Sequence, residues 1–251
     1  MIRNESGLWT FESWNGRHAV PHAFAPADAW GGFDAHRHED RARLRDAIDP
    51  SSRLVESHQT HSPHVADVTA TTTSAELAEE RLRGVDALVT RTRGVLLHAI
   101  AADCPLVFFA DRDAGVVGLA HSGWRGTVRG VIAATVSRLV EVLGASRERL
   151  RAGIAPAAGG CCYEVGPEVV AQFEALPIRV GETLRPSARA GHARLDLERV
   201  IVALLEREGI AAERVEAARA CTICGGARFH SHRRAQGRAG RMSGVIACAS
   251  S

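Results

Sequence analysis

Short apolar segments dominate the middle of the chain, and glycine, proline or aspartate separates most of them. Runs of this length with such punctuation predict β-strands. Their spacing favours hairpins or a meander over a strict alternation of strand and helix. The predicted strands cover residues 85–90, 94–101, 105–110 and 115–120, with others at 150–154, 215–219 and 244–248.

Apolar residues recur at helical spacing in several further segments. We expect helices at 40–48, at 127–143 with an end at Gly144, from Pro167 to 176, and from Asp196 as the cap to Gly209. Thr73 and Glu76 form a capping-box pattern before another helical segment. Residues 176–194 show no regular pattern. Together these elements predict an α/β (α+β) fold, with mixed sheets and helices on the outside.

Composition is that of a globular protein, with 45% hydrophobic and 24% charged residues in 251. This length fits one domain over residues 1–251. A net charge of +2 without a basic stripe argues against nucleic acid as a partner. Neither a signal peptide nor an apolar run of membrane-spanning length is found. We therefore expect a cytoplasmic protein without a membrane partner, in which the six cysteines are ligands, thiols or core residues.

A histidine and a glycine-rich turn lie where a predicted strand gives way to a predicted helix. His121 ends the strand, and Gly123 and Gly126 permit close approach of the backbone to a ligand. The N-terminus of the following helix, with Thr127 as its cap, offers N–H groups to an anion. Arg125 adds a planar cationic donor. An ordinary glycine turn explains the pattern equally well.

Two more segments carry residues that bind metals. Cys104 follows Asp103, whose charge would raise the pKa of the thiol unless a divalent metal is bound. In an extended chain, His58 and His64 share one face, and His61 faces the other way. Spacing alone allows either set to bind a metal.

Four cysteines form two close pairs. Cys221 and Cys224 have the spacing of half a structural zinc site. The other pair, Cys161 and Cys162, is adjacent, and neighbouring residues of a strand point apart. We therefore favour core or pocket-lining roles for Cys221 and Cys224 over a second zinc.

Several of these motifs occur together in one order: HQTHS (58–62), DALVT (86–90), ADCPLV (102–107), HSGWRGT (121–127), CCYEVG (161–166), CT (221–222) and FHSHRR (229–234). The chain resembles the YfiH/YlmD-like family, also called laccase-domain or multicopper polyphenol oxidase-like proteins. The resemblance implies purine nucleoside phosphorylase activity on adenosine, inosine, guanosine or methylthioadenosine, and also adenosine deaminase activity. It implies a metal site made of His61, Cys104 and His121.

Three protein ligands leave a fourth position open, as in catalytic zinc sites. Zinc is the expected cofactor, although imidazole and thiolate also tolerate copper. Asp103 and Glu164 are candidates for the acid–base group. A purine nucleoside and phosphate are the expected partners, and the candidate contacts to them are Arg41, Arg125, Tyr163, His232 and Arg233.

Two other functions compete with this one. A copper oxidase of phenols needs around ten histidine ligands in paired spacings, whereas His36-x-His38 and His230-x-His232 are the only such pairs. A zinc-stabilised, non-catalytic binding module predicts a closed site with a fourth ligand such as His64. The sequence does not indicate an oligomeric state.

Overall fold

The computed structural model describes residues 1–14, 16–56, 58–72, 84–179 and 181–249. Two six-stranded sheets face each other at the centre of the molecule. The predicted helix start at Thr73 and Glu76 lies outside the described residues. None of the described helices combines the length and apolar character needed to cross a membrane.

The first sheet joins both ends of the chain to its middle. The strand β15 pairs antiparallel with β3 on one side and with β7 on the other, and β4 runs parallel to β7. Its strands, in spatial order, are β1 (Ile2–Arg3), β2 (Trp9–Thr10), β3 (His22–Ala25), β15 (Met242–Ala247), β7 (Val95–Ala101) and β4 (Arg53–Glu56).

The second sheet carries the β8–β9 hairpin at its centre. Its strands, in spatial order, are β14 (Val215–Ala217), β10 (Arg151–Ile154), β8 (Leu106–Asp111), β9 (Val116–His121), β6 (Val85–Thr90) and β5 (His64–Asp67). A separate small sheet consists of β11 (Glu164–Val165), β13 (Ala193–Leu195) and β12 (Leu184–Pro186).

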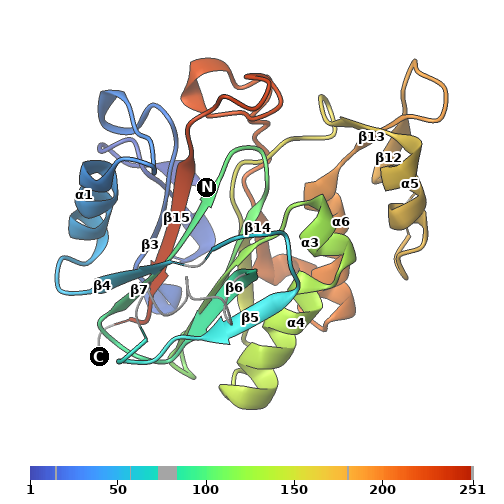
Figure 1. The fold of residues 1–251 in the computed structure, drawn as a ribbon. Coiled ribbons are helices and arrows are strands. Elements are labelled where there is room, and N and C mark those ends of the chain that lie inside the picture. Colours follow the sequence, from blue (N-terminus) through green and yellow to red (C-terminus); the bar gives the residue numbers. More distant parts are fainter. Residues whose placement is uncertain (15, 57, 73–83, 180, 250–251) are drawn as a thin grey trace.

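Helices cover the outer faces of the two large sheets (Figure 1). They are α1 (His38–Ile48), α3 (Trp124–Val128), α4 (Val131–Ser137), which continues as a π-helical turn at Arg138–Val142, α5 (Pro167–Glu174) and α6 (Leu197–Arg207). Short 3₁₀ turns occur at Glu12–Trp14, Gly16–His18, Ala29–Gly31, Ala212–Arg214 and Gly226–Arg228.

The central strands are buried on both faces, which explains their continuous apolar sequences. In β8, Phe108 packs between the two sheets, while its neighbour Phe109 packs under α4, α5 and α6. In β15, Ile246 lies between the sheets and Val245 packs toward Leu44 of α1. The resulting order of layers is helix, sheet, sheet, helix, and it confirms the predicted α/β class with mixed sheets and outer helices.

The structure corrects several predicted elements. Of the expected hairpins or meander, β8 and β9 form a hairpin, but a continuous meander is wrong because β7 leaves its neighbours in sequence and joins the other sheet. The helix expected over 127–143 starts earlier, at Trp124, and is interrupted at Gly130, whose φ of 91° is left-handed. The irregular region 176–194 contains β12 and the start of β13. Helix α6 begins as expected, because the Asp196 side chain accepts the Arg199 N–H at 3.2 Å.

Candidate metal centre and active site

His121 and Asp86 lie side by side at one end of the second sheet. Strands β6 and β9 are antiparallel with Ala87 opposite Ala120, so the register places Asp86 next to His121. The Nδ1 of His121 is 2.8 Å from Oδ1 of Asp86, and both side chains are buried. This contact fixes the orientation of the imidazole and leaves its Nε2 as the ligand atom.

Asp86 also holds the loop that carries His61. Its carboxylate accepts the backbone N–H groups of Thr60, His61 and Ser62 at 3.0, 2.9 and 2.6 Å. Burial alone would raise the pKa of Asp86, but the hydrogen bonds from His121 and Ser62 lower it below its ordinary value. The negative charge is therefore retained under the histidine at neutral pH.

The loop conformation selects among the three neighbouring histidines. His61 has a φ of 61°, in the left-handed region that residues other than glycine seldom adopt. The chain from His58 to His64 is therefore not extended, and the expected alternation of these side chains between two faces does not apply. His64 instead begins β5, where its side chain is exposed, and His58 is exposed too. His61 alone of the three reaches the cluster described next.

Cys104 completes a cluster with the two histidines. It lies in the turn between β7 and β8, and its Sγ is 3.8 Å from Nε2 of His61. One ligand atom from each of His61, Cys104 and His121 lies within 4.8 Å of the other two. The two imidazole rings meet edge to face, with centroids 4.9 Å apart. This set of donors is suited to a transition metal such as zinc.

Without a bound metal, Cys104 and His121 favour the charged forms of an ion pair. Burial opposes the charge on Cys104, but the neighbouring His121 and His61 lower the pKa of this thiol to about 6. Burial likewise opposes the charge on His121, whose pKa is raised to about 9 by Cys104 and Asp86. The thiolate required of a metal ligand is therefore already favoured at neutral pH.

Gly123 permits this close packing of ligands. A Cβ atom at this position would lie 2.7 Å from Cδ2 of His61 and 2.8 Å from Sγ of Cys104. Its backbone is extended, so the requirement for glycine comes from space and not from φ. The glycine-rich turn after His121 is thus packed directly against the cluster.

The structure contradicts the proposed cap at Thr127. Helix α3 begins at Trp124, so Thr127 lies inside it. Its hydroxyl donates to the carbonyl groups of Ser122 and Gly123, at 3.1 and 3.0 Å. Gly123 occupies the N-cap position, so no side chain caps this helix.

Asp103 ties the C-terminal loop to the cluster. Its φ of 86° is left-handed, and its carboxylate accepts hydrogen bonds from Thr222 Oγ1, Ser231 Oγ and the N–H of Arg233. Both carboxylate oxygens are engaged in this way. The acid–base role expected of Asp103 stays a prediction, and its contacts give it a positioning role.

Arg233 and Tyr163 lie next to each other, near Cys104 of the cluster. The guanidinium carbon of Arg233 lies 5.1 Å from the centroid of the Tyr163 ring. Burial, with the nearby charge of Cys104, raises the pKa of Tyr163 to about 12, so its hydroxyl stays protonated at neutral pH. Arg125 is exposed and stacks over Trp124 at 4.2 Å.

The other three candidate residues, Arg41, His232 and Glu164, are not part of the cluster. Arg41 donates to the carbonyl of Ala35 at 2.6 Å. His232 is exposed on the C-terminal loop. The carboxylate of Glu164 is bonded to Ser187 and Arg189. Among the residues that the structure describes, neither Arg41, His232 nor the Glu164 carboxylate forms a hydrogen bond or ion pair with His61, Cys104 or His121.

Asp86 is the site residue that sequence reasoning missed. It belongs to the DALVT segment, but its role depends on the strand pairing that brings it beside His121, 35 residues later in the sequence. The available signal was an acidic residue inside an otherwise apolar, buried strand, since buried carboxylates are seldom without a partner.

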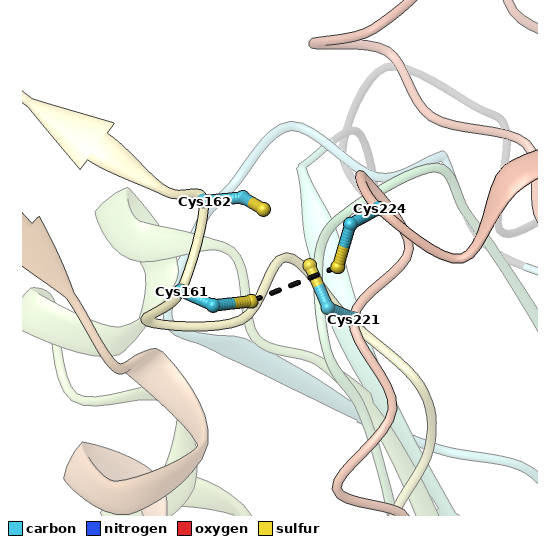
Figure 2. Close-up of side chains that lie close together, drawn as sticks. All are labelled: Cys161, Cys162, Cys221 and Cys224. Carbon is cyan, nitrogen blue, oxygen red and sulfur yellow. Dashed lines mark hydrogen bonds between the residues drawn. The ribbon is translucent and has the colours of Figure 1, made fainter.

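The four remaining clustered cysteines correct a second expectation. Cys161 and Cys162 lie in a turn, not a strand, so their side chains are free to point the same way. Their sulfur atoms and those of Cys221 and Cys224 all lie within 4.8 Å of one another (Figure 2). Cys224 is exposed and Cys221 is partly exposed, so neither is a core residue, whereas Cys221 lines a cavity, in agreement with the pocket-lining alternative.

Comparisons with known proteins agree with the motifs. The chain is 38% identical over 246 residues to a purine nucleoside phosphorylase of Deinococcus radiodurans, covering 91% of this chain and 89% of the relative. It is 34% identical over 183 residues to adenosine deaminase RL5 of an unknown prokaryotic organism, covering 72% of this chain and 70% of that one.

The fold has a similar solved structure in Bacillus licheniformis hypothetical protein YfiH. The TM-score is 0.86 at 28% identity, and the match covers 96% of each chain. The family model for multi-copper polyphenol oxidoreductase laccase matches residues 27–249. The chain therefore belongs to this laccase-domain family, as its motifs predicted.

Proposed function

We propose that this protein is a zinc-dependent purine nucleoside phosphorylase. In this reaction phosphate attacks C1′ of the ribose, the bond to the purine breaks, and free base and ribose-1-phosphate form. The observation that carries the proposal is the cluster of His61, Cys104 and His121, with Asp86 holding the imidazole. The names of the relatives support the same activity.

The donor set supports zinc. Two imidazoles and one thiolate suit a tetrahedral ion, and three protein ligands leave a position open. When bound, zinc would supply Lewis acidity at that position. Within the described residues, the other group of candidate ligands contains only cysteines, so no histidine cluster for several copper ions accompanies the first. This favours the phosphorylase over a phenol oxidase.

Cationic side chains near the cluster suit an anionic substrate. Arginine forks match the geometry of phosphate oxygens. In the proposed roles, Arg233 and Arg125 bind phosphate, and Tyr163 contacts the nucleoside as a hydrogen-bond donor. Asp103 positions Arg233, because its carboxylate accepts the Arg233 N–H at 2.7 Å. Arg41 and His232 stay candidates from the sequence alone.

Deamination of adenosine is the second candidate, and the name of one relative favours it. That reaction needs a group that transfers protons next to the reacting purine carbon. The carboxylates of Asp103 and Asp86 are both occupied by hydrogen bonds within the protein. Phosphorolysis gives Arg125 and Arg233 a role as phosphate-binding groups, whereas deamination does not require them. We therefore favour phosphorolysis.

The test is a chromatographic assay of the zinc-loaded protein with adenosine, with and without phosphate. His61→Ala is compared with His64→Ala, an exposed histidine three residues away that serves as the matched control. We expect adenine and ribose-1-phosphate only with phosphate, loss of activity in His61→Ala, and retention in His64→Ala. Inosine formed without phosphate would establish deamination instead.

An unchanged substrate peak with adenosine, inosine, guanosine and methylthioadenosine would overturn the proposal and favour a binding module. The partners of the proposed enzyme are a purine nucleoside and phosphate. Its location in the cytoplasm and its organisation as one domain stay predictions from the sequence.

A further inference from the structure

Four cysteines from two separate loops meet at the surface. Cys161 and Cys162 lie between β10 and β11, and Cys221 and Cys224 lie between β14 and β15. Their sulfur atoms lie within 4.8 Å of one another, and the Cys161 and Cys224 sulfurs are 3.8 Å apart. Figure 2 shows the four side chains converging from the two loops.

These distances match a metal site better than a disulfide. A zinc–sulfur bond of about 2.3 Å in a tetrahedron places two sulfur atoms about 3.8 Å apart. A disulfide requires about 2.05 Å. The Cys161–Cys224 distance therefore leaves room for an ion between the sulfur atoms.

The backbone around the cluster is arranged to hold the thiolates. The N–H of Gly159 donates to Sγ of Cys221 at 3.3 Å, the kind of contact that orients a metal ligand. A Cβ at Gly159 would lie 3.1 Å from Cβ of Cys221, so the two loops approach closely here. Arg234 donates to the carbonyl groups of Thr222 and Ile223, which fixes the turn between Cys221 and Cys224.

We propose that Cys161, Cys162, Cys221 and Cys224 bind a second zinc ion, separate from the ion at His61, Cys104 and His121. Four protein ligands close the coordination shell, so this ion has a structural role. Two of the four, Cys161 and Cys221, also line part of a cavity of about 930 Å³.

The second ion would fasten two loops that support the first site. Tyr163 directly follows Cys162, and the hydroxyl of Thr222 donates to Asp103 at 2.6 Å. The N–H of Ala158 donates to the carbonyl of Asp103 at 2.8 Å. Loss of this ion is therefore expected to loosen the surroundings of Cys104 without removing its ligands.

The first experiment uses the wild-type protein and alkylation read out by peptide mass spectrometry. Cys161 and Cys224 are exposed, so an alkylating reagent reaches both sulfur atoms unless a metal binds them. Burial and the neighbouring thiols raise the pKa of Cys161, so the labelling is carried out at alkaline pH, where more of the reactive thiolate forms. We expect both to be protected in zinc-loaded protein and labelled after chelation, with no reductant needed. Equal labelling in both states, or labelling only after a reductant, would overturn the proposal, the latter by revealing disulfides.

The second experiment counts bound zinc and examines its ligands by X-ray absorption. His61→Ala/Cys104→Ala is expected to keep about one zinc per chain, with sulfur ligands alone at about 2.3 Å. Cys161→Ser/Cys224→Ser is expected to lose about one zinc relative to wild type, and Cys248→Ser, a buried cysteine elsewhere, to lose none. Zinc with nitrogen or oxygen ligands, or none, in the first variant would refute the four-cysteine site.

Discussion

At the scale of single residues, Asp86 determines the geometry of the candidate metal centre. It contacts His121 and the three N–H groups of the His61 loop, so one carboxylate positions two of the three ligands. The hydrogen bonds that orient a metal ligand affect how tightly the metal is bound. This makes Asp86 the residue through which metal affinity is most readily tested.

We expect Asp86→Asn to lower zinc affinity at the His61, Cys104 and His121 site by about 10- to 100-fold, because the amide carries no charge and has only one oxygen to accept the loop N–H groups. Competition with a chromophoric chelator measures this change. The matched control is Asp111→Asn, a buried carboxylate of the same sheet that is bonded to Arg149. An equal loss of affinity in both variants would contradict the assigned role.

The ion pair between Cys104 and His121 predicts a pH dependence of thiol reactivity. The pKa of Cys104 is lowered to about 6, so in metal-free protein its thiolate persists as pH falls from 9 toward 6 and is protonated below that. Alkylation of the Cys104 peptide, measured by mass spectrometry, is expected to continue at neutral pH. The same peptide in urea serves as the control and should lose reactivity below about pH 8.5.

The candidate ligands were obtained from the sequence only through the family resemblance. Spacing left His58, His61 and His64 as alternatives, because a left-handed residue at His61 cannot be inferred from an alternating pattern. Asp86 was missed because its partner is brought close by strand pairing. The adjacent cysteines were misjudged because a turn, not a strand, carries them.

At the scale of elements, sequence was most informative where both faces of a strand are buried. Strands β6 to β9 stand out as continuous apolar runs, and their predicted ranges differ from the observed ones by one residue at most. Strands β1 to β5 have only two to four residues each, which is too short for a period to be recognised. The break between α3 and α4 follows from the left-handed Gly130, which an apolar periodicity does not indicate.

The predicted cap of α6 gives a test of element stability. Asp196→Ala removes the acceptor for the Arg199 N–H, and we expect the free energy of unfolding to fall by about 1 kcal/mol. Urea denaturation followed by circular dichroism measures this. Glu213→Ala, at an exposed position, should change stability by less than about 0.5 kcal/mol, and a loss as large as that of Asp196→Ala would argue against capping.

At the scale of the whole molecule, the candidate metal centre lies beside the turn through which the chain passes from the first sheet to the second. Cys104 follows β7 of the first sheet and precedes β8 of the second, while His121 ends β9. The sequence predicted the central strands and the helices, but not the assignment of the strands to two sheets. Strand β7, which joins the other sheet, has the same apolar pattern as its neighbours in sequence. A bound ion would reinforce this end of the second sheet, where β8 and β9 already pair, and would attach the His61 loop to it.

Removal of metal is expected to destabilise the entire fold. At a free zinc concentration about one hundred times Kd, a single site stabilises the native state by about 2.7 kcal/mol. We expect calorimetry to show a lower Tm after chelation and recovery on adding zinc. In His61→Ala, chelation should lower the Tm only by the part that comes from the cysteine cluster. An unchanged Tm in chelated wild-type protein would contradict the prediction.

The buried pair of Cys104 and His121 has a further consequence for how a metal enters the site. With pKa values of about 6 and about 9, the sulfur has already lost its proton at pH 7, and the imidazole carries an extra one. An incoming cation must therefore displace the proton from Nε2 of His121. Metal uptake by this centre thus acidifies an unbuffered solution through a histidine and not through the cysteine.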